Sequence, residues 1–320
     1  MNFHLQFPIR PFPQKINYSH SVFFIGSCFG ENIAELMKEH KFITTANPHG
    51  ILYNPLSIAV AIRRYIKNDR LTESELFFAN ECWNSWEHHS RFSNPNKQKC
   101  LSEINKSISE AHIALKNAEW LFITFGSAFV YKREAKVIGN CHKQAQKEFL
   151  KELLSTSEMV EEYSKLISQL ILFNSKLKIV FTVSPVRYIR DGVVENNLSK
   201  ARLIDATHQL VSKSVFYFPS FELVIDDLRD YRFYKEDLVH PNEQAINYVF
   251  EKFVAANFDE KTMQLFQSIK EIRTAKKHKP SNADNVLYKK FQENFLERCK
   301  KIQLEHPNLD FKNELEYFRT

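Results

Sequence analysis

The chain has 320 residues, of which 43% are hydrophobic and 26% charged, and this balance is typical of a globular protein that folds in water. The formal net charge of +6 is mild, and the sequence shows no zinc-finger spacing, aromatic RNA-binding motif or DNA-reading helix, so nucleic-acid binding has little support. No run of about 18 apolar residues exists that could span a membrane. The length allows one large domain with additions, or two domains.

The five cysteines are odd in number and include no CxxC pair. This pattern argues against a disulfide framework and against a structural zinc site. The opening segment, MNFHLQFPIRPFPQ, lacks the apolar core of a signal peptide. We therefore expect a reducing, cytoplasmic setting, with no membrane segment.

Short apolar runs alternate with amphipathic stretches along the first half of the chain. They predict strands at 21–26, 41–46 and 119–126, and helices at 31–40, 54–67 and 102–118. Residues 68–110 are less regular. Chain segments of this kind, with strands separated by helices, are typical of α/β proteins.

The same alternation continues to residue 257. It predicts a strand at 178–186, a second strand opening the stretch 215–226, and helices at 158–174, 198–213 and 240–257, the last started by a proline. Residues 258–320 show no strand pattern and predict two or so charged helices, broken near 276–284. Their positive charge is typical of a solvated helix face, although a basic tail can also meet an acidic partner or nucleic acid.

About five strands in this order predict a three-layer, flavodoxin-like α/β fold, with a parallel sheet covered by helices on both faces. We expect this domain to occupy residues 1–257 and a charged helical extension to occupy residues 258–320. In open sheets of this kind, ligands bind beyond the carboxyl ends of the strands.

Ser27 lies at such a position, directly after the first predicted strand. Gly26 allows the backbone angles of a sharp turn, and a helix starting near Phe29 would aim its free N–H groups at the turn. That arrangement can hold a developing oxyanion. Taken alone, however, Gly-Ser at a strand-to-helix turn is also an ordinary cap.

A second motif lies near the predicted last helix of the domain, where Asp237, His240 and Pro241 follow one another in DLVHP. Asp237 can reach one imidazole nitrogen of His240 and leave the other nitrogen to take a proton from a hydroxyl. The motif alone is also compatible with a helix cap and an incidental histidine. Together with Ser27, at the other end of one domain, it indicates nucleophilic catalysis.

The motifs FIGSCF and DLVHP resemble those of the SGNH/GDSL hydrolase superfamily. More closely, GSCFGENIAE, NPHGILYNPLSI, FITFGSAFVY, NCHK and FTVSPVRY look like the GSCFA-domain family, and the resemblance covers about residues 20–255. Gly30 stands where the family's namesake motif has Ala. The resemblance implies that Ser27 is the nucleophile, His240 the general base and Asp237 its orienting acid. It further implies ester hydrolysis or acyl transfer on a small-molecule or acylated substrate, with no metal and no organic cofactor.

One departure concerns the oxyanion. The wider superfamily has an Asn after its third strand, whereas this chain has TFGSAF, without Asn. Candidates for the missing donor are the backbone N–H groups of Ser27 and Gly50, and the side chains of Asn140 and His142. Each of these residues is also an ordinary loop former.

Three further features have alternative interpretations. Cys28 could be a thiol nucleophile at a helix N-terminus, but we expect it to point into the core. Arg187 and Arg190 follow a strand and could clamp an anionic group, although surface ion pairing is the default.

His88 and His89 adjoin Glu87, but adjacent residues point different ways, so a shared metal is disfavoured. A role lining the substrate cleft, with Trp83 and Trp86, is the alternative. The second hypothesis for the whole chain is a non-catalytic binding or scaffold protein on an SGNH-like fold, because a fold does not fix a function.

Overall fold

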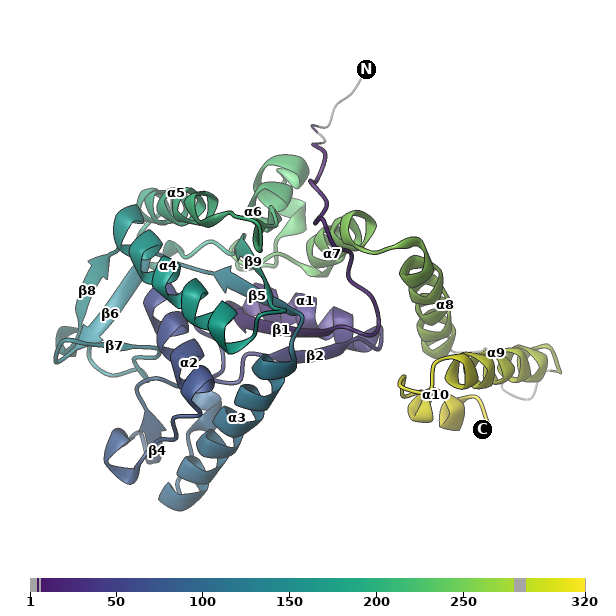
Figure 1. The fold of residues 1–320 in the computed structure, drawn as a ribbon, viewed down its shortest axis with the longest axis horizontal. Coiled ribbons are helices and arrows are strands. Elements are labelled where there is room, and N and C mark those ends of the chain that lie inside the picture. The colour runs from purple at the N-terminus through teal and green to yellow at the C-terminus, as the bar shows by residue number, and fades with distance from the viewer. Residues whose placement is uncertain (1–4, 6, 279–285, 320) are drawn as a thin grey trace.

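A five-stranded parallel sheet forms the centre of the protein (Figure 1). The computed structural model describes residues 5, 7–278 and 286–319. The strands lie in the order β10-β9-β5-β1-β2, which is the flavodoxin-like order. Their bounds are β1 Ser21–Gly26, β2 Ile43–Ala46, β5 Trp120–Phe125, β9 Lys178–Val183 and β10 Val215–Tyr217. The predicted α/β class and the parallel sheet are confirmed.

Helices cover both faces of the sheet because each parallel strand must return by a crossover. Val22 and Phe24 of β1 face one helical layer, while Phe23 and Ile25 face the other, as the two-residue period of a strand dictates. All four are buried, and each contributes roughly 1.5–3 kcal/mol to folding by its burial. The first layer holds α1 Cys28–Glu39 and α7 Glu243–Asn257; the second holds α2 Pro55–Lys67, α3 Lys97–Asn117, α4 Thr156–Phe173 and α5 Val193–Leu210.

Two small antiparallel sheets were not predicted from the sequence. One is the hairpin of β3 Leu76–Ala79 and β4 Cys82–Ser85. The other joins β6 Phe129–Arg133, β7 Lys136–Ile138 and β8 Leu150–Leu153 in the order β7-β6-β8. The three-stranded sheet follows β5 directly and so stands beside the carboxyl end of the main sheet.

The strand predicted to open the stretch 215–226 is confirmed as β10, and the segment after it corrects one sequence-based prediction, the start of the helix expected at 240–257. The strand expected to open 215–226 ends at Tyr217, and the chain continues as the short helix α6 Ser220–Glu222 and a π-helical turn at Leu223–Leu228. Pro219 has no backbone N–H for a sheet ladder, which favours this change. Helix α7 is capped by Asn242, whose side chain accepts the Ala245 N–H, so the helix is not started by a proline.

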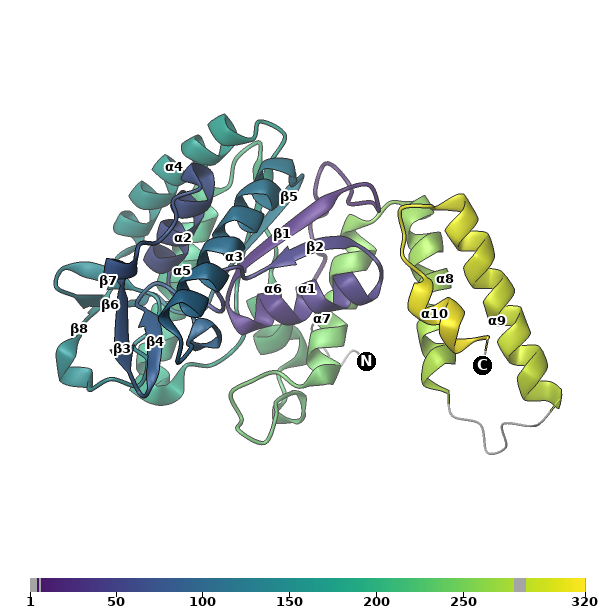
Figure 2. The ribbon, with the colours of Figure 1, turned by 90° about the horizontal axis from the view of Figure 1, so that it is seen from below.

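The C-terminal part of the described chain is helical, as predicted. Figure 2 shows α8 Glu260–Lys277, α9 Val286–Glu305 and α10 Lys312–Tyr317 lying together to one side of the sheet. Most of the predicted break at 276–284 lies outside the described residues. The division of the chain at residue 257 stays a proposal, for which the end of α7 at Asn257 is the structural basis. Of the helices that the structure describes, none is long and apolar enough to cross a bilayer.

Candidate active site

The turn between β1 and α1 is held by backbone contacts to the neighbouring strands. Gly26 has φ +130°, and a Cβ at this position would lie 2.1 Å from the Thr124 carbonyl oxygen of β5. The Gly26 N–H donates to Oδ1 of Asn47, after β2, at 2.8 Å, and the Ser27 N–H donates to the Thr124 oxygen at 3.0 Å. Only glycine fits this position, and Ser27 therefore has a fixed backbone.

Ser27 is the N-cap residue of α1, and its side chain is buried. Its Oγ makes no hydrogen bond with any described residue, including the helix N–H groups that a capping serine normally satisfies. A hydroxyl that is buried and unpartnered costs free energy, and that of Ser27 gives nothing back as a side-chain cap of α1. It stands at the positive end of the α1 dipole.

Cys28 lines the same cavity as Ser27, so the expectation that it points into the core is wrong. Burial raises the pKa of its thiol, and the N–H groups of Cys28 and Phe29, which act in the opposite direction, do not compensate. The thiol therefore stays protonated at neutral pH. Because the thiolate is the reactive form, Cys28 is poorly suited to be the nucleophile.

Asp237 and His240 form a hydrogen-bonded pair, with 2.7 Å between Oδ2 of the carboxylate and Nδ1 of the imidazole. The other carboxylate oxygen accepts the backbone N–H groups of His240 and Val239, each at 2.9 Å. These backbone bonds, followed by the imidazole, lower the pKa of Asp237 to about 2. An ionised Asp237 requires the proton on Nδ1 of His240, which leaves Nε2 to accept another.

Ser27 and His240 line one cavity of about 650 Å³ at the carboxyl ends of the strands. Gly126 and Ser184, which follow β5 and β9, line it as well. The segments around residues 27 and 240, far apart in the chain, therefore meet where the fold places ligands. The Ser27 Oγ and the imidazole are not hydrogen-bonded to each other.

Of the candidate oxyanion donors, Asn140 lines the cavity, whereas Gly50 and His142 are not among its lining residues. The Gly50 N–H donates to the Asn47 carbonyl oxygen at 2.7 Å, and Nε2 of His142 lies 2.8 Å from the Ser85 carbonyl oxygen. The Ser27 N–H is occupied by the bond to β5 described above. The N–H groups of Ser27 and Gly50 and the Nε2 atom of His142 therefore already have hydrogen-bond partners in the backbone.

Asn54 lines the cavity and was not singled out from the sequence. It is the N-cap of α2, and its Oδ1 accepts the Ser57 N–H at 2.8 Å. Oδ1 of Asn140 likewise accepts the His142 N–H at 2.8 Å. In both residues the Nδ2 group is left without a partner among the described residues. The Asn-Pro pair before α2 indicates a cap, but nothing in it indicates that the amide faces a cavity.

A second overlooked residue is Lys200 of α5, which is fully buried. Its Nζ donates to the carbonyl oxygens of Gly126 at 2.6 Å and Ser184 at 2.7 Å. It therefore joins the carboxyl ends of β5 and β9 beneath the cavity. Burial lowers the pKa of Lys200 to about 7.

The segment of residues 86–89, before α3, lies partly on the cavity lining and partly outside it. His89 lines the cavity, as expected, but His88 is buried and stacks on His49 with 3.9 Å between ring centroids. Trp86 stacks on Phe77 at 3.6 Å, outside the cavity lining. Within the described ranges, no three His, Cys, Asp or Glu side chains are grouped so that they could hold a metal ion.

Two models of known protein families together match most of the chain. The GSCFA family matches residues 21–253, and the C-terminal domain of GSCFA domain proteins matches residues 269–320. The chain belongs to the GSCFA family. No curated protein matches this GSCFA sequence.

Solved structures with some similarity to the GSCFA chain include an acetyl esterase mutant with an acetate ion, at 8% identity and a TM-score of 0.36, covering 79% of this chain and 99% of that one. A carbohydrate esterase family 3 from Talaromyces cellulolyticus has 8% identity, a TM-score of 0.35 and the same coverage. A Clostridium thermocellum family 3 carbohydrate esterase has 9% identity and a TM-score of 0.30, covering 78% and 98%. Similarity at this level says nothing about the substrate of the GSCFA chain.

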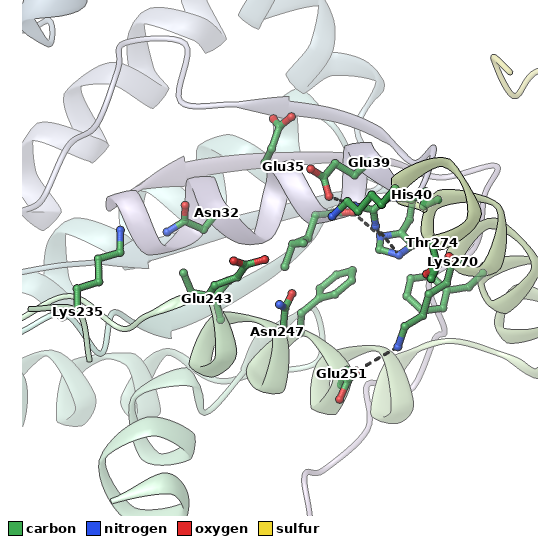
Figure 3. Close-up of a pocket in the computed structure, with 16 residues that line it drawn as sticks. Asn32, Glu35, Glu39, His40, Lys235, Glu243, Asn247, Glu251, Lys270 and Thr274 are labelled. Carbon is green, nitrogen blue, oxygen red and sulfur yellow. Dashed lines mark hydrogen bonds and ion pairs between the residues drawn. The ribbon is translucent and has the colours of Figure 1, made fainter. Parts of the chain in front are cut away.

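A second cavity of the GSCFA protein, of about 500 Å³, lies between α1, α7 and α8 (Figure 3). Charges of both signs line it, and some are paired, as in the 3.1 Å contact between Lys270 and Glu251. His40 closes one end, with its ring stacked on Phe266 at 4.3 Å between centroids. Neither Ser27 nor His240 lines this cavity.

Proposed function

We propose that the protein is a serine-nucleophile hydrolase that cleaves an ester or transfers its acyl group, with Ser27, His240 and Asp237 as catalytic triad. One observation carries the proposal: an unpartnered serine hydroxyl and a carboxylate-oriented imidazole line the same cavity. The substrate is then a small or acylated molecule. The cytoplasmic setting stays a prediction from the cysteine pattern.

The chemistry follows from the proton positions. Nε2 of His240 accepts the Ser27 hydroxyl proton as Oγ forms a bond to the substrate carbonyl carbon. When the ester bond breaks, the imidazolium returns that proton to the leaving alkoxide. Water or another acceptor then attacks the acyl-enzyme by the same route. His240 is 43% exposed at the side chain, so it has room to approach Ser27 when substrate binds.

The developing oxyanion needs hydrogen-bond donors that are not already occupied. The Nδ2 groups of Asn54 and Asn140 meet this requirement, and the N-terminus of α1 adds its positive dipole end. We propose that one or both amides replace the missing superfamily asparagine.

A fluorophosphonate probe, which reacts with activated serines, tests the nucleophile. We expect peptide mapping to find the probe on Ser27, and labelling to fall by about 10³-fold or more in His240→Ala. Cys28→Ala is the matched control, and it should label like the wild type. Labelling that persists in a folded Ser27→Ala protein would exclude Ser27.

The alternative is a binding protein that uses the cavity without catalysis. The absence of a hydrogen bond between Ser27 and His240 among the described residues favours it. In that case the folded wild type would remain unlabelled, and Ser27→Ala would bind ligands as the wild type does.

A further inference from the structure

The cavity lining is asymmetric in charge. Lys143, Arg187 and Arg190 line it, whereas none of the lining side chains in the described chain is Asp or Glu. A cavity lined by charges of one sign attracts ligands of the other sign. The three cations come from two separate segments of the chain, around residues 143 and 187–190.

None of these three cations forms an ion pair with a carboxylate in the described parts of the chain. Three carboxylates that lie near lining residues along the chain are engaged elsewhere. Glu31 pairs with Arg91 at 3.0 Å, Asp191 with Lys151, and Asp237 holds the imidazole. The default of surface ion pairing therefore does not account for Arg187 or Arg190.

Arg187 is also held in position. Its guanidinium lies over the rings of Tyr234 and Tyr231, at 4.7 and 5.3 Å, and contacts the Tyr231 hydroxyl at 3.3 Å. Its backbone N–H donates to the carbonyl oxygen of Val239 at 3.1 Å, directly before His240. A planar cation with several donors is thus held by two tyrosines on the lining of the cavity that His240 also lines, and a guanidinium suits a carboxylate, sulfate or phosphate.

We propose that the substrate is an ester carrying a second, negatively charged group, which Arg187 binds with help from Arg190 and Lys143. This inference rests on the proposed hydrolase function and defines its substrate class. The rings of Tyr53 and Phe129 supply an apolar wall for the uncharged part of the molecule. The anion orients the ester and undergoes no reaction itself.

Two matched esters test the proposal: para-nitrophenyl hemisuccinate, which is anionic, and para-nitrophenyl butyrate, which is neutral. We expect kcat/KM for the hemisuccinate to exceed that for the butyrate by about 10-fold or more, because one charge-assisted contact contributes a factor of this size. Added salt should reduce this preference. Arg187→Gln and Arg190→Gln should each lower it, while Arg70→Gln, which removes an arginine outside the cavity, should not.

Equal kcat/KM for the two esters would overturn the anion proposal and leave the hydrolase function intact. If the wild type cleaves neither ester, calorimetric titration of Ser27→Ala with both separates the two ideas. Tighter binding of hemisuccinate would then support anion recognition and count against catalysis, and equal binding would overturn the anion proposal as well. Inhibition of butyrate cleavage by succinate, sulfate or phosphate identifies the preferred anion.

Discussion

At the scale of single residues, the turn that presents Ser27 depends on Gly26. We expect Gly26→Ala to lower the free energy of unfolding by about 3 kcal/mol or more, because the new Cβ meets a strand carbonyl at a left-handed φ. Urea unfolding measures the change. Gly126→Ala is the control: its Cβ would meet Tyr53 atoms no closer than 3.2 Å, and it should cost clearly less.

Asn54 combines a structural and a proposed chemical role, and two substitutions separate them. Asn54→Asp keeps the cap oxygen for the Ser57 N–H but loses the amide donor, so we expect kcat to fall about 10²-fold with little loss of stability. Asn54→Ala should lose the same activity and about 1 kcal/mol of stability. Steady-state kinetics and urea unfolding give both values. Full activity of Asn54→Asp would show that its amide is not an oxyanion donor.

Some residues of the candidate site could be predicted from the sequence, and others could not. Ser27 and His240 were found because each adjoins a recognisable strand or helix boundary. Gly50 and His142 were reasonable candidates, yet local backbone bonds consume their donors. Which way an amide or N–H points depends on contacts between segments far apart in the chain, and the sequence pattern does not contain this information.

At the scale of elements, the C-terminal helices offer a test of packing. Phe311, the residue before α10, is fully buried beside the Lys41–Glu314 ion pair. We expect Phe311→Ala to cost about 3–5 kcal/mol and to loosen α8, α9 and α10. Hydrogen exchange of these helices measures the effect.

Leu304→Ala is the matched control, because this leucine of α9 is 83% exposed. The free energy of unfolding of this variant should stay within about 0.5 kcal/mol of the wild-type value. Similar losses in the two variants would contradict the packing described for Phe311.

The strands of the main sheet were predicted and those of the two small sheets were not, for a physical reason. The central strands are buried on both faces and read as continuous apolar runs, as in 21–26 and 178–183. The strands of the two small sheets have three to five residues and are only partly buried, so they show neither a long apolar run nor clear alternation. The stretch after β10 is apolar enough for a strand, but Pro219 redirects it into helical turns.

At the scale of the whole molecule, buried histidines predict sensitivity to acid. Burial lowers the pKa of His40 to about 4 and of His49 to about 3, and it holds that of His88 well below 6.5. Below pH 6.5 the unfolded chain therefore binds more protons than the folded one, and stability falls as pH falls. Each histidine contributes a slope of up to about 1.4 kcal/mol per pH unit.

Urea unfolding at several pH values between about 7.5 and about 4.5 gives the free energy of unfolding at each pH and hence this slope. His40→Phe keeps an aromatic ring against Phe266 and should reduce the slope by one histidine's share. If the urea concentration at half-unfolding does not change between these pH values, the imidazoles gain protons in the folded state as easily as in the unfolded state.

The cavity joins Ser27, from the end of the first strand, to His240, which precedes the last helix packed on the sheet. A ribosome makes the chain from its N-terminus, so the serine emerges long before the imidazole. Under the proposed mechanism, the hydroxyl lacks its base until the segment around residue 240 has docked. Newly made chains would then be unreactive even after all five strands of the main sheet have been synthesised, because residue 240 follows β10, the last of these strands.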